Sequence, residues 1–127
     1  MNQDRIRVLS VDDHALLREG IAAIINHQSD MLLVSQASGG REAIQQYREH
    51  RPDVTLMDLR MPDLSGIDAL LAIRAEFPDA CIIMLTTFED DAEVRRALEA
   101  GARAYLLKSN PPNQLVQAIR QIHAGNK

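Results

Sequence analysis

The sequence predicts a single α/β domain: a three-layer, doubly wound fold around a five-stranded parallel sheet. Five short apolar or β-branched runs alternate with longer segments whose apolar residues recur at helical spacing. Most of the short runs are apolar almost throughout, which is typical of parallel strands covered by helices on both faces. The chain has 127 residues, enough for one domain to bury a core without disulfides or a structural metal.

The five short runs are the expected strands. They comprise residues 6–11, 31–37, 54–57, 81–87 and 104–107. Right-handed crossovers between successive parallel strands then place the intervening helices on both faces of the sheet. Cys81 is the single cysteine, and its place in an apolar run predicts a small buried hydrophobic residue. One cysteine excludes an intrachain disulfide and a cysteine-cluster metal site.

The longer segments are the expected helices, and four of the five have a clear apolar face. In chain order these faces are formed by Leu17, Ile21 and Ile24, by Ile67, Leu70 and Leu71, by Val94, Ala97 and Leu98, and by Leu115, Ile119 and Ile122. The second segment, residues 41–50, is the weakest, with Ala43, Ile44 and Tyr47 as its apolar residues. The order along the chain is therefore five strand–helix pairs.

Proline and glycine residues support these boundaries. Pro52 precedes the third strand, and Pro78 follows the third helix, which it would stop. Gly101 lies where the fourth helix should end. Pro111 and Pro112 suit the beginning of the last helix, because proline is favoured in a first helical turn.

The composition excludes several function classes. Fourteen Lys plus Arg against eighteen Asp plus Glu give a net charge of −4, which argues against direct nucleic-acid binding by this chain. The four aromatic residues, Tyr47, Phe77, Phe88 and Tyr105, are too few for a base-stacking surface. The sequence contains no run of 18 apolar residues, so it predicts no membrane-spanning helix. The N-terminus lacks the apolar core of a signal peptide, so we expect a cytoplasmic location.

Polar residues follow the expected strands at the edge where such folds bind ligands. In an open parallel sheet this edge lies outside the carboxyl ends of the strands. The first strand ends in Asp12 and Asp13, the third in Asp58, the fourth in Thr86 and the fifth in Lys108. Because parallel strands end on the same side, the sequence predicts that these five side chains share one site.

Each of these residues, taken alone, has a simpler explanation. An aspartate in the 12–13 pair suits a helix cap, and Asp58 suits a turn before Pro62 as well as it suits a functional acid. Thr86 alone is a common strand residue, and Lys108 alone would be solvated. These explanations do not predict that all of the residues gather at one edge, so we favour the shared site.

Carboxylates gathered at one edge predict a divalent cation. Three buried acids repel one another, and a bound metal relieves that repulsion. Oxygen ligands with open positions for water and phosphate suit Mg²⁺. A metal, a lysine and a hydroxyl beside a carboxylate are what phosphoryl transfer requires, and the carboxylate itself can form an acyl phosphate.

Four segments resemble the receiver domain of two-component response regulators, in order and spacing. They are Val-Leu-Ser-Val-Asp-Asp-His at 8–14, Leu-Met-Asp-Leu-Arg-Met-Pro-Asp-Leu-Ser-Gly at 56–66, Leu-Thr-Thr-Phe at 85–88 and Gly-Ala-Arg-Ala-Tyr-Leu-Leu-Lys at 101–108. These sequence motifs are most similar to those of the nitrate-response and nodulation-type transcription regulators, which carry a LuxR-type helix-turn-helix domain. The resemblance covers essentially the whole chain and implies a flavodoxin-like fold with strand order 2-1-3-4-5.

The resemblance implies a role for each residue of the expected site. Asp58 corresponds to the phosphorylated aspartate. Asp12 and Asp13 correspond to the acidic pair that holds Mg²⁺ together with Asp58 and the backbone carbonyl of Arg60. Lys108 corresponds to the lysine that pairs with the phosphoryl oxygens.

The resemblance also implies a switch and a gate. Thr86 corresponds to the hydroxyl that moves to the phosphoryl group, and Tyr105 to the aromatic side chain that turns inward with it. Plain core packing remains an alternative for Tyr105. Arg60 and Phe88 occupy positions that gate the attacking water, and their bulk predicts slow autodephosphorylation. Ser109 stands where many receivers have a proline after a cis bond, so no cis bond is assumed.

The expected function is phosphorelay signalling rather than enzymatic turnover. A sensor histidine kinase would donate phosphate to Asp58, and residues 1–127 would form the receiver domain. A C-terminal helix-turn-helix domain, absent from this chain, is expected in the full-length protein, which would bind DNA only through it. The resemblance also admits homodimerisation on phosphorylation. No membrane partner is expected.

Four alternatives stay open on the sequence. The first is a stand-alone receiver without a DNA-binding output. The second is a Mg²⁺-dependent phosphatase with an aspartyl-phosphate intermediate, which Arg60 disfavours because such enzymes usually have an acid there. The third is a nucleotide- or flavin-binding module, for which Gly39 and Gly40 are weak evidence. The fourth is a degenerate receiver, disfavoured because all five site residues are present.

Overall fold

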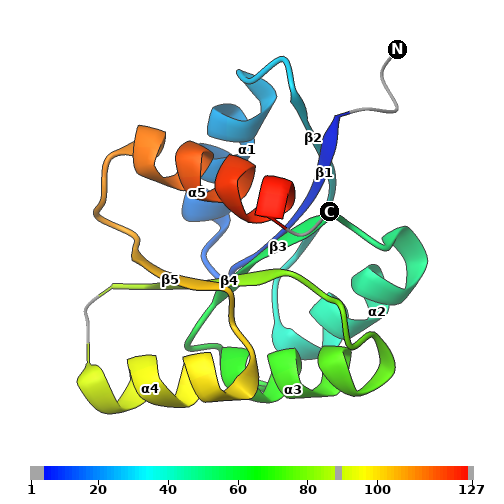
Figure 1. Ribbon diagram of the computed structural model, residues 1–127, viewed down its shortest axis with the longest axis vertical. Coiled ribbons are helices and arrows are strands. Elements are labelled where there is room, and N and C mark those ends of the chain that lie inside the picture. Colours follow the sequence, from blue (N-terminus) through cyan, green and yellow to red (C-terminus); the bar gives the residue numbers. More distant parts are fainter. Residues whose placement is uncertain (1–4, 88–89, 126–127) are drawn as a thin grey trace.

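The computed structural model describes residues 5–87 and 90–125, which form five strands and five helices in alternation (Figure 1). Their bounds are β1 Ile6–Val11, α1 Ala15–Asn26, β2 Met31–Ala37, α2 Gly40–His50, β3 Val54–Asp58, α3 Gly66–Glu76, β4 Ile82–Thr86, α4 Asp91–Ala100, β5 Ala104–Leu107 and α5 Pro112–Gly125. The strands are parallel in the order β2-β1-β3-β4-β5. Helices α1 and α5 cover one face, and α2, α3 and α4 cover the other. The predicted fold class and strand order are confirmed.

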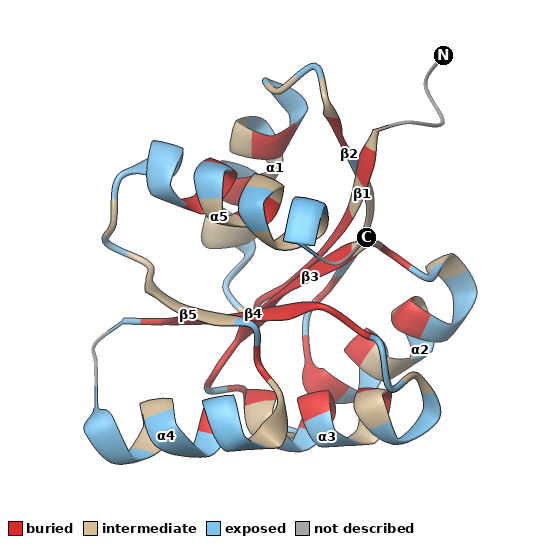
Figure 2. Ribbon diagram, in the orientation of Figure 1, coloured by how far each residue is buried: buried red, intermediate tan, exposed pale blue. Residues whose placement is uncertain are grey.

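The alternation of side chains along the central strands produces two separate cores. On β3, Met57 belongs to the core beneath α2, α3 and α4, whereas its neighbour Leu56 belongs to the core beneath α1 and α5. Successive residues of a strand point to opposite faces, so a strand buried on both sides must be apolar throughout. Every residue of β3 and β4 is buried, and the edge strand β5 is only partly buried (Figure 2).

Local side-chain chemistry sets the helix ends. The Ser65 hydroxyl accepts a hydrogen bond from the Asp68 backbone N–H and caps α3. The Asp90 carboxylate accepts one from Ala92 at 2.9 Å and caps α4. Gly101 ends α4 with φ +112°, a left-handed conformation that favours glycine, as the sequence predicted.

Two residues of the expected helix faces are not in the core. Leu71 is 48% exposed and Leu98 is 49% exposed, so the apolar faces of α3 and α4 extend beyond the part of each helix that is buried. Each of these helices buries only one stripe of its surface against the sheet. Cys81 is buried, as predicted. Among the described residues there is no cis peptide bond, and no helix there is both long and apolar enough to cross a membrane.

Candidate functional site

The carboxyl edge of the sheet gathers the predicted polar residues from four strands. Asp12 follows β1, Asp58 ends β3, Thr86 ends β4 and Lys108 follows β5. The side chains of both acids are almost completely buried, as is Thr86. Strand order reverses between β1 and β3, and doubly wound sheets bind ligands at such a switch point.

Lys108 links the two buried acids. Its Nζ atom lies 2.8 Å from Oδ2 of Asp12 and 2.9 Å from Oδ1 of Asp58. The Lys108 backbone N–H donates to the carbonyl of Thr86 at 2.7 Å, which anchors the lysine beside β4. Burial lowers the pKa of Lys108, but the hydrogen bonds and charges of both acids outweigh it and raise that pKa overall. The side chain is therefore a buried, charged group, unlike the solvated lysine of the simpler explanation.

Asp58 combines burial with one open oxygen. Burial raises its pKa to about 6, with a contribution from the nearby charge of Asp12, while Lys108 opposes the shift. The Oδ2 atom is buried and accepts no hydrogen bond from the described residues. A buried carboxylate oxygen without a donor is costly, and a bound cation would relieve that cost.

The site includes a histidine that the sequence interpretation did not assign. Ligand atoms of Asp12, Asp13, His14 and Asp58 all lie within 4.8 Å of one another. His14 Nδ1 lies 3.2 Å from Oδ1 of Asp12 and 3.2 Å from Oδ1 of Asp13. The His14 backbone N–H also donates to Asp12 at 2.8 Å, where α1 begins, so this acid supports the helix as well. The place of His14 directly after Asp12 and Asp13 was the sequence feature that could have identified it as part of the site. The three carboxylates fit a hard cation such as Mg²⁺.

The loop between β3 and α3 connects the site to α4. Arg60, two residues after Asp58, places Nη2 2.7 Å from Oε1 of Glu93 on α4. At the end of the loop, the Gly66 N–H donates to the carbonyl of Leu59 at 2.8 Å. These two contacts tie the loop to both neighbouring helices.

Tyr105 lies next to the predicted switch hydroxyl. It pairs with Met84 in the register between β5 and β4 and is only partly buried. Burial raises the pKa of the Tyr105 phenol, and the nearby Thr86 side chain opposes the shift. The structure thus brings Tyr105 to Thr86, as the resemblance implied. Phe88, the second predicted gate, lies outside the described residues.

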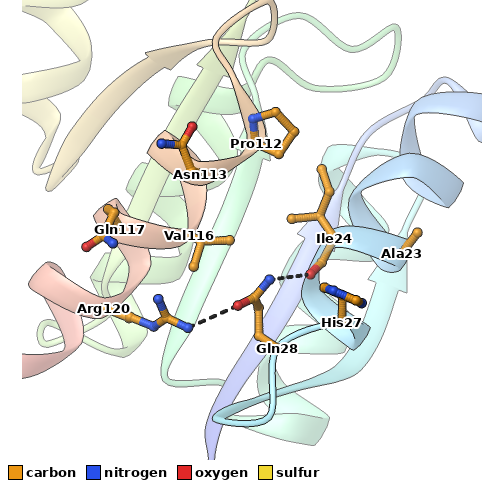
Figure 3. A pocket seen from close by; sticks show the side chains of 9 residues that line it. All are labelled: Ala23, Ile24, His27, Gln28, Pro112, Asn113, Val116, Gln117 and Arg120. Carbon is orange, nitrogen blue, oxygen red and sulfur yellow. Dashed lines mark hydrogen bonds between the residues drawn. The ribbon is translucent and has the colours of Figure 1, made fainter.

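A separate hollow of about 460 Å³ lies between α1 and α5 (Figure 3). Arg120 of α5 donates to Gln28 at 3.0 Å across this hollow. The same guanidinium pairs with Asp30 through two bonds of 2.8 and 3.0 Å. None of the predicted site residues lines this hollow, so it is distinct from the acidic site.

Comparisons with known proteins identify the family to which this sequence is similar. A family model described as response regulator receiver domain matches residues 8–120. Oxygen regulatory protein NreC of Staphylococcus epidermidis is 42% identical over 94% of this chain. Response regulator protein VraR of Staphylococcus aureus is 41% identical, also over 94%. The chain spans 56% of the length of that NreC and 57% of that VraR.

Solved structures show the same fold. A LuxR-family two-component response regulator from Aurantimonas sp. superposes with a TM-score of 0.92 at 40% identity, covering 95% of this chain and 86% of that one. The signal receiver domain of NarL from Mycobacterium tuberculosis gives a TM-score of 0.92 at 30% identity, covering 96% of this chain and 98% of that one.

Proposed function

This chain belongs to the response regulator receiver-domain family of two-component signalling, and from that membership we propose that Asp58 accepts a phosphoryl group from a sensor histidine kinase. The observation that carries the proposal is the Lys108 ammonium group, 2.9 Å from Asp58 and 2.8 Å from Asp12. A fixed positive charge beside a buried carboxylate suits a nucleophile that must receive a negatively charged group.

The proposed reaction is a transfer between nitrogen and oxygen. An Asp58 carboxylate oxygen forms an O–P bond while the P–N bond to the kinase histidine breaks. The electron pair of the P–N bond returns to the imidazole nitrogen, which takes a proton from solvent. Lys108 stays beside Asp58 and balances the charge of the phosphoryl oxygens.

Mg²⁺ is the cofactor we propose for this site. Asp12, Asp13, Asp58 and the backbone carbonyl of Arg60 would hold it. When bound, it would neutralise the acids and the incoming phosphoryl charge. The clustering of the three carboxylates and the open Asp58 oxygen support this assignment.

The response to phosphorylation would begin at Thr86. We infer that its hydroxyl moves to the phosphoryl group and that Tyr105 turns into the space beside it. The proximity of the two side chains on the neighbouring strands β4 and β5 supports this coupling. Arg60 and Phe88 would shield the acyl phosphate from water and keep its autodephosphorylation slow.

The output of the whole protein would lie outside this domain. One of the similar solved structures is a LuxR-family two-component response regulator. The chain spans little more than half the length of NreC and VraR. We therefore propose a C-terminal DNA-binding helix-turn-helix domain in the full-length protein, with DNA contacted only there. A cytoplasmic location and homodimerisation on phosphorylation belong to the same proposal.

Intact-mass analysis tests the phosphoacceptor directly. Incubation with acetyl phosphate and Mg²⁺ should add a single phosphate that hydroxylamine removes, because hydroxylamine cleaves acyl phosphates. Asp58→Asn should give no adduct, whereas Asp53→Asn, an aspartate at the opposite end of β3, should be labelled as the wild type is. No adduct on the wild type with either acetyl phosphate or a phosphorylated kinase would overturn the proposal.

A further inference from the structure

Asp63 joins the loop after the proposed phosphoacceptor to the beginning of α2. Its Oδ1 atom accepts a hydrogen bond from the Gly40 backbone N–H at 3.0 Å, and Oδ2 accepts one from Arg41 at 3.1 Å. The residue preceding α2 is Gly39, which has no side chain to cap the helix. Asp63 therefore supplies, from a distant loop, the capping carboxylate that α2 lacks.

The two glycines before α2 make room for this contact. A Cβ atom at Gly39 would lie 2.8 Å from Oδ1 of Asp63, and one at Gly40 would lie 2.8 Å from the carbonyl oxygen of Leu64. Gly39 has an extended backbone with φ −166°, which any residue adopts, so close approach rather than conformation explains the glycine. The Gly-Gly pair, which the sequence offered as weak evidence for nucleotide binding, thus has a structural role.

The electrostatics of the contact keep Asp63 ionised. The backbone N–H groups of Arg41 and Gly40 lower the pKa of its carboxyl group. A carboxylate also interacts favourably with the positive end of a helix dipole. The contact therefore persists across the pH range in which Asp58 changes its charge.

The contact bears on the proposed metal site through a short stretch of chain. Arg60 lies between Asp58 and Asp63, and its carbonyl is the proposed backbone ligand. The Gly66–Leu59 hydrogen bond fixes the far end of the loop, and Arg60 itself reaches Glu93 through its side chain. Asp63 holds the middle of the loop from the opposite side.

We propose that Asp63 is a positioning residue for Mg²⁺: by clamping the β3–α3 loop onto the N-terminus of α2, it fixes the backbone of Arg60 and sets the affinity for the ion. This inference rests on the proposed function. It gives a role to a residue that touches neither the metal nor the phosphoryl group, in the way that outer groups orient metal ligands.

Calorimetric titration of the metal-free chain with Mg²⁺ alone tests the proposal. Asp63→Ala should raise the dissociation constant for Mg²⁺ at least about threefold. This is a smaller loss of metal affinity than is common when a group that contacts a metal ligand directly is removed. The control is Asp53→Ala, because the Asp53 carboxylate also accepts a backbone hydrogen bond from a residue distant in sequence, Arg7 of β1, at 2.8 Å. It lies at the opposite end of β3 and should leave Mg²⁺ affinity unchanged. Equal affinity in wild type and Asp63→Ala would overturn the proposal.

A second variant tests the same contact from its other side and covers the case in which Asp63→Ala does not fold. Gly39→Ala pushes a methyl group against Asp63 without straining the backbone, so it should also weaken Mg²⁺ binding. Combined with Asp63→Ala, it should cause no further loss, because the contact is already gone. Fully additive losses would show that the two residues act independently and would contradict the positioning role.

The outcomes separate this inference from the proposed function. If the wild type binds Mg²⁺ and is phosphorylated on Asp58, but Asp63→Ala binds equally well, only the positioning role fails. If the wild type binds no Mg²⁺ in the millimolar range typical of weak sites, both fail. Equal weakening by Asp53→Ala would assign the effect to a general loss of stability and would also overturn the positioning role.

Discussion

Lys108 Nζ lies 2.9 Å from Oδ1 of Asp58, and both side chains are largely withdrawn from solvent. The pair comes from β3 and the end of β5, which are separated in the sheet by β4. The positive charge is therefore in place beside the carboxylate before any metal or phosphoryl group arrives. Charges fixed in advance in a buried site need no reorganisation during the reaction, which is why they accelerate it.

Replacing Lys108 by alanine should slow phosphorylation of Asp58 and raise the pKa of that carboxyl further. The lysine opposes the repulsion between Asp58 and Asp12, so its removal favours the protonated, unreactive acid. We expect labelling by acetyl phosphate in saturating Mg²⁺ to slow at least about tenfold, as for loss of one charge-stabilising donor. Arg95→Ala, which removes an exposed cation of α4, is the control. Equal labelling rates for Lys108→Ala and wild type would contradict this role.

The raised pKa of Asp58 predicts a pH dependence of stability in the metal-free protein. The folded state binds the proton with a pKa of about 6, whereas the ordinary value is 3.8. Between these values the folded state holds more protons than the unfolded chain, so stability falls as pH rises through this window and levels off above it. A shift of this size corresponds to about 3 kcal/mol at most.

Asp58→Asn should remove that dependence. Urea unfolding in EDTA should show the variant more stable than wild type at pH 7.5, by about 1–3 kcal/mol, with a smaller difference at pH 4.5. Parallel pH profiles of the two proteins would show that ionised Asp58 carries no such cost.

Magnesium should stabilise the folded chain through Asp13. A ligand at ten times its dissociation constant adds about 1.4 kcal/mol to the free energy of unfolding. We expect thermal denaturation to shift upward in Mg²⁺ relative to EDTA, and the shift to vanish in Asp13→Asn. The carboxylate of Asp13 lies in the acidic cluster but is paired with His14 rather than Lys108, so its neutralisation should spare the lysine contacts. A full shift in the variant would exclude Asp13 as a ligand.

The sequence predicted the convergence of the site because topology alone decides it. Apolar runs that end in Asp12, Asp58 and Thr86 must bring those residues to one edge once the strands are parallel. The pairing of Lys108 with both acids was not predictable in detail, because it depends on side-chain conformations at the end of an edge strand. His14 was overlooked because its position in the motif carried no assigned role; in the structure its side chain lies beside the acids and is mostly exposed.

Other features depend on distances that a sequence does not show. Asp63 caps α2 from 23 positions away, and nothing local at Gly39 or Gly40 indicates that partner. Helical periodicity identified the inward faces of α3 and α4 but not their width. Leu71 and Leu98 belong to these apolar faces by their spacing, yet each is about half exposed.

Arg60 should lengthen the life of the acyl phosphate. Its side chain reaches from the loop after Asp58 to Glu93 on α4, and we propose that it covers one approach to the site. Arg60→Ala would open that approach to water, so we expect the phosphate on Asp58 to be lost several-fold faster after the phosphodonor is removed. Decay followed by intact mass measures this, with Arg95→Ala as control. Loss from the wild type within seconds would contradict shielding by Arg60 altogether.

Gly66 should tolerate no side chain, unlike Gly20. A Cβ atom at Gly66 would lie only 2.3 Å from the carbonyl oxygen of Asp58 and 2.7 Å from Cε of Met84, so Gly66→Ala must displace the backbone at the phosphoacceptor. We expect a loss of about 1–3 kcal/mol in the free energy of unfolding, as for overpacking, together with slower labelling of Asp58. A methyl group at Gly20, an exposed position of α1, would meet no atom within 4 Å, so Gly20→Ala should instead stabilise by about 0.5–1 kcal/mol. Urea unfolding of the pair separates steric conflict from helix propensity, and similar behaviour of the two variants would exclude the close approach at Gly66.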